Sequence, residues 1–188
     1  MLGTSSTGFD ACIQRLVELS GAKNILELGC GQGKFGNMMK SGDVLRSVRA
    51  VQKVFGSNDV DHLKARGYEE VIDADILEYF RNGFDQTYDM VVALDVIEHF
   101  MYSDVMSIVN FALYRADYML LVWPSAHPQN GVHHSFDRHR SSFELRDLSD
   151  KFDVIFYAQS GFAEMNCVHR YHIALLRGHM NVKVLPFY

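Results

Sequence analysis

Short apolar runs alternate with helix-like segments along most of the chain. The helix-like segments include residues 34–40, 76–81 and 103–115. Strands that alternate with helices form parallel sheets, because each helix returns the chain to the same edge of the sheet. The pattern therefore predicts an α/β fold with a mostly parallel sheet. The apolar runs expected to form its strands are residues 24–28, 50–55, 71–72, 90–94 and 119–123.

The two ends of the chain add further elements. Residues 9–20 carry apolar side chains at helical spacing, and Gly21 follows as a helix C-cap. Near the other end, residues 143–150 are expected to form a helix. The next two apolar runs, residues 154–157 and 170–176, follow each other without an obvious helix between them. Such adjacent strands indicate an antiparallel C-terminal edge.

Composition and charge indicate a globular domain and argue against several classes of function. With 188 residues, 48% of them hydrophobic, residues 1–188 are expected to form a single domain with a buried core. A net charge of −5 argues against generic nucleic-acid binding, which depends on lysine and arginine neutralising phosphates. The three widely spaced cysteines suit neither a disulfide framework nor a zinc site. Without a signal-like start or a long apolar segment, we expect a cytoplasmic protein that does not bind membranes.

Four glycines lie between the strand at residues 24–28 and the helix at residues 34–40. They are Gly29, Gly31, Gly33 and Gly36. Glycine allows a tight backbone turn and the close approach of a ligand to the start of a helix. Because the last three also satisfy the G-x-G-x-x-G pattern of nicotinamide dinucleotide sites, the glycines alone leave the ligand open.

Glu27 separates the two kinds of ligand. Its carboxylate is expected at the strand end beside the glycines. There it would repel a pyrophosphate and attract the ammonium of an amino-acid moiety. Charge therefore favours S-adenosylmethionine over a nicotinamide dinucleotide, and a nicotinamide-dependent oxidoreductase remains an alternative.

The sequence resembles the class I S-adenosylmethionine-dependent methyltransferases. The resemblance rests on ILELGCGQGKFG at residues 25–36, DADIL at residues 73–77 and YDMVVALDVIEHF at residues 88–100. It implies a three-layer α/β sandwich with a seven-stranded Rossmann-like sheet. It also implies S-adenosylmethionine as cofactor, S-adenosylhomocysteine as product, and methyl transfer to an oxygen or nitrogen of a small-molecule acceptor.

The resemblance also assigns cofactor contacts. Glu27 would face the methionine end, and Asp75 and Ile76 would meet the adenine amino group and ring, beside the glycine positions and Asp95. Family members also carry an acidic residue at the end of the second strand, which holds the ribose hydroxyls. Here the matching position falls near Val54, where the sequence has no acid. Either Asp59 or Asp61 could take that role, and the lack of such an acid makes a degenerate, non-catalytic binding protein an alternative.

A candidate reaction site follows the fourth strand. Asp95, Glu98 and His99, together with the distant His139, resemble the ligand set of metal-dependent small-RNA 2′-O-methyltransferases and of ubiquinone-pathway O-methyltransferases. Glu98, His99 and His139 would then hold a divalent ion that activates a hydroxyl. The alternative, which we favour, is that Glu98 and His99 brace a helix and that His99 or His139 acts as a metal-free base. A metal-dependent RNA 2′-O-methyltransferase stays a minority interpretation.

The loop at residues 125–142 is long enough to be functional. The segment WPSAHPQN at residues 123–130 is expected to line the acceptor pocket. Three arginines could bind a polyanion or pair with Asp137 and Glu144. The histidines of this loop, expected to line the pocket, are His127, His133 and His134; the arginines are Arg138, Arg140 and Arg146.

Overall fold

The computed structural model describes residues 7–42, 44–53, 57–82, 86–125, 139–164 and 167–181. Its strands form one seven-stranded sheet in the order β3-β2-β1-β4-β5-β7-β6. All neighbouring pairs from β3 to β5 are parallel, whereas β7 runs antiparallel to both β5 and β6. The predicted parallel sheet with an antiparallel C-terminal edge is therefore confirmed. The strands are β1 (Asn24–Leu28), β2 (Ser47–Gln52), β3 (Glu70–Asp73), β4 (Tyr88–Leu94), β5 (Ala116–Pro124), β6 (Val154–Glu164) and β7 (Cys167–Arg177).

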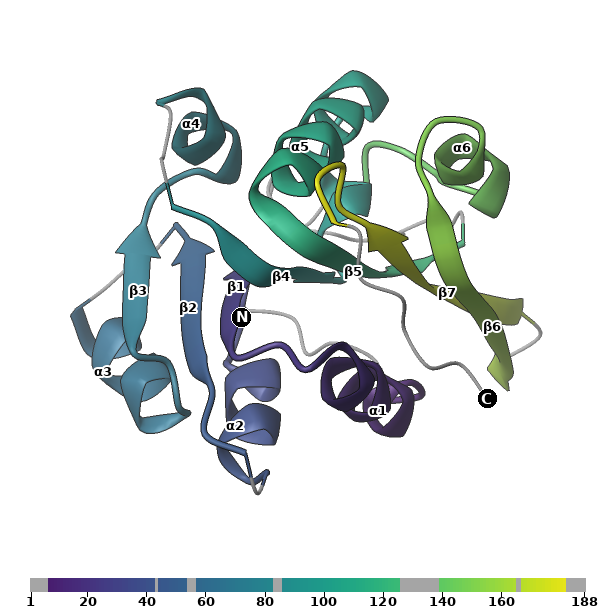
Figure 1. Ribbon diagram of the computed structural model, residues 1–188. Coiled ribbons are helices and arrows are strands. Elements are labelled where there is room, and N and C mark those ends of the chain that lie inside the picture. The colour runs from purple at the N-terminus through teal and green to yellow at the C-terminus, as the bar shows by residue number, and fades with distance from the viewer. Residues whose placement is uncertain are drawn as a thin grey trace.

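Helices cover both faces of the sheet, which gives the three layers expected (Figure 1). One face carries α1 (Asp10–Ser20), α2 (Lys34–Lys40) and α3 (Ser57–Ala65), and the other carries α4 (Ile76–Arg81), α5 (Tyr102–Arg115) and α6 (Leu145–Ser149). Two apolar cores result, one on each side. Because β4 and β5 face a core on both sides, they are apolar almost throughout. No helix of the described segments is both long and apolar enough to cross a membrane.

Element boundaries differ from the predicted ones mainly where polar residues occur inside strands. The last two strands have 11 residues each, well beyond the apolar runs that predicted them. The added residues include polar ones such as Gln159, Ser160 and Arg177, which hide the ends of the strands from a search for apolar runs. The second strand begins earlier than predicted and ends at Gln52, so the strand end expected near Val54 was wrong by two positions. Val54 itself lies outside the described residues.

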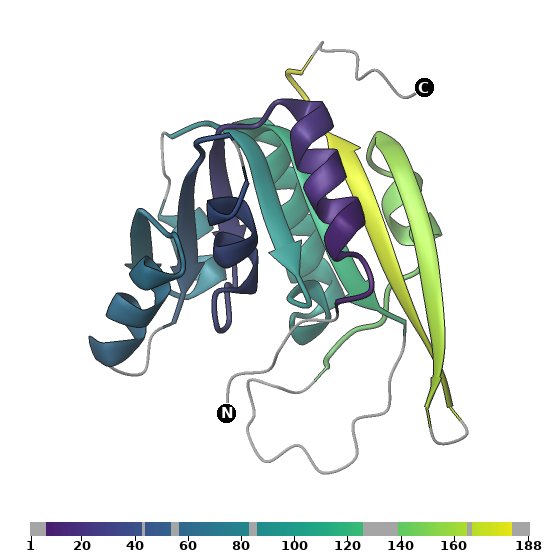
Figure 2. The same ribbon diagram turned by 90° about the horizontal axis from the view of Figure 1, so that it is seen from below.

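The carboxyl ends of β1, β4 and β5 meet at one edge of the sheet, at the lower end of Figure 2. In open α/β sheets this is the edge where ligands bind. The glycine loop follows β1 there, and the 3₁₀ turn η1 (Ile97–His99) follows β4. The fold therefore brings the two predicted parts of the site to the same edge.

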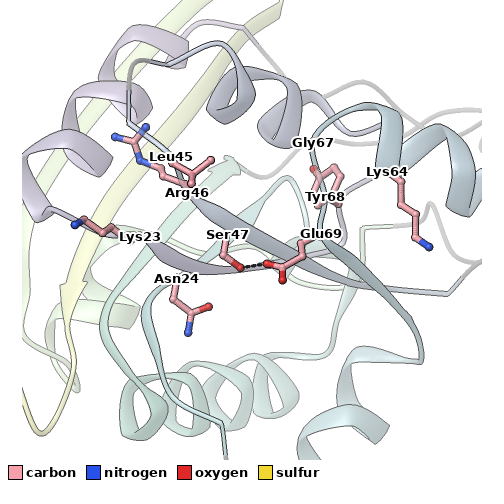
Figure 3. A pocket seen from close by; sticks show the side chains of 9 residues that line it. All are labelled: Lys23, Asn24, Leu45, Arg46, Ser47, Lys64, Gly67, Tyr68 and Glu69. Atoms are coloured by element: carbon pink, nitrogen blue, oxygen red, sulfur yellow. Dashed lines mark hydrogen bonds between the residues drawn. The ribbon is translucent and has the colours of Figure 1, made fainter.

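A pocket lies at the opposite edge, where β1, β2 and β3 begin (Figure 3). Its lining includes Lys23, Arg46 and Lys64. Tyr68 also lines it, while the hydroxyl of the same residue reaches the glycine-loop region. This pocket is separate from the edge where the predicted site residues gather.

Candidate active site

The glycine loop turns through a left-handed backbone. Gly29, Gly31 and Gly33 have φ angles of 66°, 52° and 82°, a region that L residues with side chains rarely adopt. Space is also restricted, because a Cβ on Gly29 would lie 2.7 Å from the Val96 side chain. The sharp turn between β1 and α2 thus requires glycine for both conformational and steric reasons.

Glu27 is buried directly before this loop. Only 2% of its surface is exposed. Burial raises the pKa of its carboxyl from 4.5 to about 8, despite the opposing effects of the Tyr68 hydrogen bond and the Lys34 charge. The Tyr68 hydroxyl donates to Glu27 Oε2 and accepts from the Gly36 amide at 3.0 Å. The Glu27 carboxyl is therefore mainly protonated at neutral pH, and a cation that binds beside it would favour its ionised form.

Gln52, the last residue of β2, contacts the glycine loop. Its side-chain oxygen accepts hydrogen bonds from the Gly31 amide at 2.6 Å and from the Cys30 thiol at 3.3 Å. Its amide nitrogen donates to the Gly31 carbonyl at 3.3 Å. Gln52 therefore occupies the strand end where the family resemblance leads us to expect an acid, and its neutral amide pairs with the loop backbone.

Asp75 and Ile76 lie where β3 passes into α4. Asp75 is the N-cap of α4, since its Oδ1 accepts from the Leu77 and Glu78 amides at 2.8 and 3.2 Å. Both bonds go to the same oxygen. Ile76 is buried and belongs to the core between the sheet and α5. The adenine contacts expected of these two residues stay predictions.

Asp95 and Glu98 follow β4 in a strained turn. Asp95 has a φ of 55°, the one positive φ of a non-glycine residue in the described segments, and its amide donates to the Val122 carbonyl at 2.9 Å. Glu98 is 2% exposed. Desolvation raises the pKa of its carboxyl well above 4.5, and the neighbouring Asp95 charge raises it further. Its Oε2 is buried without a hydrogen-bond partner among the described residues.

His99 and His139 converge on Glu98. The Nε2 atoms of both histidines lie 3.9 Å from Glu98 Oε1, and the two rings meet edge to face at 5.1 Å. The three side chains can each offer a ligand atom within 4.8 Å of the others. The structure therefore brings together Glu98, His99 and His139, which are 41 residues apart at their extremes.

Backbone contacts bring His139 to this position. The Glu98 carbonyl accepts from the Arg140 amide at 2.7 Å and from the Ser141 amide at 3.3 Å. The Ser141 hydroxyl donates to the Phe100 carbonyl at 2.7 Å. Residues 139–141 are thus attached to the turn that carries Glu98 and His99.

Other predicted residues have different positions. Trp123, expected to line the acceptor pocket, is fully buried in the core, and its indole N–H donates to the Phe143 carbonyl at 2.9 Å. Arg140 is exposed, and Arg146 pairs with Asp150 at 3.3 Å. Asp59 and Asp61 lie on α3, which begins five residues after Gln52, and the ribose contact expected of one of them stays a prediction. The remaining loop residues lie outside the described part of the chain: His127, His133, His134, Asp137 and Arg138.

Sequence reasoning missed Tyr68 and Gln52. Tyr68 lies 41 positions from its partner Glu27, and nothing in the local pattern connects them. Gln52 could have been found from the sequence, because it follows the apolar residues that form β2. It lies two positions before Val54, where we expected the strand to end. Both residues contact the glycine loop or the acid beside it.

Replacing Glu27 with glutamine should remove a pH-dependent loss of stability. Between the unfolded pKa of 4.5 and the folded pKa of about 8, the folded chain holds a proton that the unfolded chain has released. The free energy of unfolding therefore falls by about 1.4 kcal/mol per pH unit as pH rises through this window. In urea unfolding, Glu27→Gln should match the original chain near pH 4.5 and exceed it near pH 8. The exposed Glu78→Gln is the control; equal behaviour of both variants would contradict the expectation.

Comparisons with known proteins agree with this architecture. No protein-family model and no curated protein sequence matches the chain. Among solved structures, the methyltransferase domain of a bacterial Hen1 (CtHen1) has 14% identity and a TM-score of 0.62, over 89% of this chain and 96% of that one. The N-methyltransferase NodS from Bradyrhizobium japonicum WM9 has 13% identity and a TM-score of 0.60, over 92% and 98%.

A third similar structure is magnesium protoporphyrin IX methyltransferase from Synechocystis PCC 6803 with bound S-adenosylmethionine. It has 14% identity and a TM-score of 0.56, and the match covers 93% of this chain and 86% of that one. Identities this low speak for the fold and not for the acceptor. The strand order, the glycine turn and these neighbours together show that the chain has the fold of the class I S-adenosylmethionine-dependent methyltransferases.

Proposed function

We propose that residues 1–188 form one methyltransferase domain that transfers a methyl group from S-adenosylmethionine to an oxygen or nitrogen of a small-molecule acceptor. The observation that carries this proposal is the buried Glu27 carboxyl directly before the glycine turn. In a site of low polarity, an ionised carboxylate attracts the ammonium of a methionine moiety and opposes a pyrophosphate. S-adenosylhomocysteine would be the product.

Each predicted contact has a physical role in this proposal. The left-handed glycines leave the loop backbone open to close approach by the cofactor. Asp75 Oδ1 caps α4, and the second carboxylate oxygen suits the adenine amino group. The similar structures include one with bound S-adenosylmethionine, which supports the choice of cofactor.

The acceptor would lie near Asp95, His99 and His139. A sulfonium is already a strong methyl donor, so the protein needs to align it with a nucleophile and to accept one proton. His139 and His99 are partly exposed, with 17% and 27% of their side chains accessible. Either imidazole can take the proton that the acceptor loses.

Calorimetric titration with S-adenosylhomocysteine tests the proposal. We expect saturable binding that strengthens as pH rises towards about 8, because the ligand ammonium favours ionised Glu27 and binding below that pH releases a proton. Glu27→Gln should weaken binding at least about tenfold, since a charged hydrogen-bonding partner is lost. It should also remove the pH dependence.

Two controls accompany this titration. Glu78→Gln removes an exposed carboxylate and should leave binding unchanged. A nicotinamide dinucleotide should give no saturable heat. Silence with S-adenosylhomocysteine would instead favour the degenerate binding protein, and binding of the dinucleotide alone would favour the oxidoreductase.

Gln52→Glu should increase cofactor affinity. A carboxylate at the end of β2 can accept hydrogen bonds from both ribose hydroxyls while still accepting from the Gly31 amide, which Gln52 does at 2.6 Å. Bonds to a charged group add about 1.5 kcal/mol or more, so titration should show S-adenosylhomocysteine binding about tenfold tighter. Gln52→Ala, which removes the loop contacts without adding charge, should bind more weakly than the original chain. A Gln52→Glu chain that binds no better would place the ribose elsewhere.

A metal-dependent reaction on a hydroxyl is the second candidate, favoured by the cluster of Glu98, His99 and His139. The residues fit a divalent ion, because Glu98 Oε2 is buried without a partner among the described residues and the set mixes oxygen and nitrogen donors. When bound, such an ion would lower the pKa of an acceptor hydroxyl. An RNA 2′-hydroxyl is one such acceptor, although the net charge of −5 gives little electrostatic support for RNA binding.

Titration with Mn²⁺ separates the two candidates without an acceptor. If the cluster is a metal site, the chain should bind one ion, and Glu98→Gln and His139→Asn should each weaken binding about tenfold or more. His179→Asn changes a histidine outside the cluster and should leave binding unchanged. An original chain that binds no ion would leave the metal-free base as the better account.

A further inference from the structure

A buried histidine near the carboxyl end of β5, His172, forms hydrogen bonds with two hydroxyl groups. His172 on β7 is 1% exposed and stacks on Trp123 at 5.0 Å. Its Nε2 lies 2.6 Å from the Ser125 hydroxyl, and its Nδ1 lies 2.8 Å from the Tyr157 hydroxyl. Desolvation lowers the pKa of the ring, so that His172 is neutral at physiological pH. A neutral imidazole donates through one nitrogen and accepts through the other.

The direction of these bonds follows from the partners. A phenol is a stronger hydrogen-bond donor than an aliphatic alcohol, and the alcohol is the better acceptor. The Tyr157 hydroxyl therefore donates to Nδ1, and Nε2–H donates to Ser125 Oγ. The Ser125 proton is then directed away from the ring. Hydrogen bonds in a chain polarise one another, which strengthens the terminal Ser125 donor.

A cationic residue, Arg170, lies next to Ser125 on the neighbouring strand. Arg170 and His172 are two positions apart on β7 and therefore point to the same face of the sheet. The Arg170 side chain is exposed. Its charge adds to the lowering of the His172 pKa by desolvation, and it opposes the rise in the Tyr157 pKa that burial causes. The Arg170 carbonyl accepts from the Ser125 amide at 2.7 Å, which fixes the two residues relative to each other. Within the described segments the guanidinium makes no ion pair.

The position of this pair relative to the candidate active site is also defined. Tyr171, between Arg170 and His172, pairs with Pro124 across the β5–β7 ladder. Burial raises the pKa of Tyr171 to about 12, and the charges of Asp95 and Glu98 contribute to that rise. The Tyr171 side chain itself packs against the core on the α1 side and lies on the other face of β7 from Arg170 and His172, because successive side chains of a strand point to opposite faces. Ser125 directly follows β5 and Arg170 lies next to it on β7, so both residues lie at the carboxyl edge of the sheet, the edge of the proposed acceptor site.

We propose that Ser125 and Arg170 bind a carboxylate of the methyl acceptor, with His172 and Tyr157 as positioning residues that orient the Ser125 hydroxyl. The inference rests on the proposed function for the identity of the ligand as the methyl acceptor. A guanidinium offers paired N–H donors that match the two oxygens of a carboxylate, and Ser125 adds a third donor. Glu144, whose charge also acts on His172 and Tyr157, forms the capping box of α6 with Asp147.

Binding of benzoate tests the subsite on the full chain, followed by NMR chemical shifts, with neutral benzamide as the matched probe. We expect saturable benzoate-induced shifts at Ser125 and Arg170, and none with benzamide. Ser125→Ala and Arg170→Gln should each weaken benzoate binding about tenfold or more. Arg146→Gln removes an equal charge at another exposed arginine, one that pairs with Asp150, and should have no effect. Equal binding of both probes, or benzoate binding unaffected by Arg170→Gln, would overturn the proposal.

The tautomer of His172 provides an independent measurement. Nitrogen-15 NMR should show the proton on Nε2, and Tyr157→Phe should increase the population with the proton on Nδ1. His179 is an internal reference, because its Nε2 lies 3.1 Å from Asn110 Oδ1, which can only accept. A proton on Nδ1 in the original chain would mean that Ser125 donates to the ring. That result would overturn its role as a donor to the ligand.

Failure of this inference is distinguishable from failure of the proposed function. Binding of S-adenosylhomocysteine without binding of benzoate would contradict the carboxylate subsite alone. If the chain instead binds benzoate at Ser125 and Arg170 but does not bind S-adenosylhomocysteine, the methyltransferase proposal is contradicted. The ligand of the subsite is then not a methyl acceptor.

Discussion

The burial of one carboxyl group, that of Glu27, constrains the whole candidate cofactor site. An acid at 2% exposure is costly in its ionised form, so the fold surrounds it with a Tyr68 donor and places Lys34 close enough to favour the charge. Tyr68 in turn needs room beside α2, and Gly36 supplies it, because a Cβ there would lie 2.4 Å from the Tyr68 ring. The fourth glycine of the loop is thus explained by packing against a tyrosine and not by ligand approach.

Most of the fold could be predicted from the sequence because the sheet is buried on both faces. Strands β1, β4 and β5 are nearly continuous apolar runs, and each is followed by a residue that breaks the pattern, namely Gly29, Asp95 or Ser125. Prediction failed where a strand extends beyond the core. The outer half of β6 carries Gln159 and Ser160 in a regular ladder with β7, and pairing there depends on backbone hydrogen bonds that leave no apolar signature.

The candidate site was predictable as a set of residues but not as an arrangement. Spacing alone placed Glu98 and His99 on one turn, and the resemblance added His139. That His139 reaches Glu98 depends on two backbone amides that bond the Glu98 carbonyl, a contact between segments that no sequence pattern encodes. Gln52 is the opposite case, since its position follows from counting along β2, whereas its pairing with both polar groups of Gly31 appears only in three dimensions.

Trp123 is the single tryptophan of the chain, and its surroundings make it an optical reporter. Its indole is fully buried, stacks on His172 and bonds to the Phe143 carbonyl, which links β5, β7 and the segment leading to α6. Intrinsic emission from this protein therefore originates at one corner of the sheet. A change in the protonation or stacking of His172, or a displacement of Phe143, alters that emission directly. Conformational changes confined to α3 or to the far edge at β3 leave the emission unchanged.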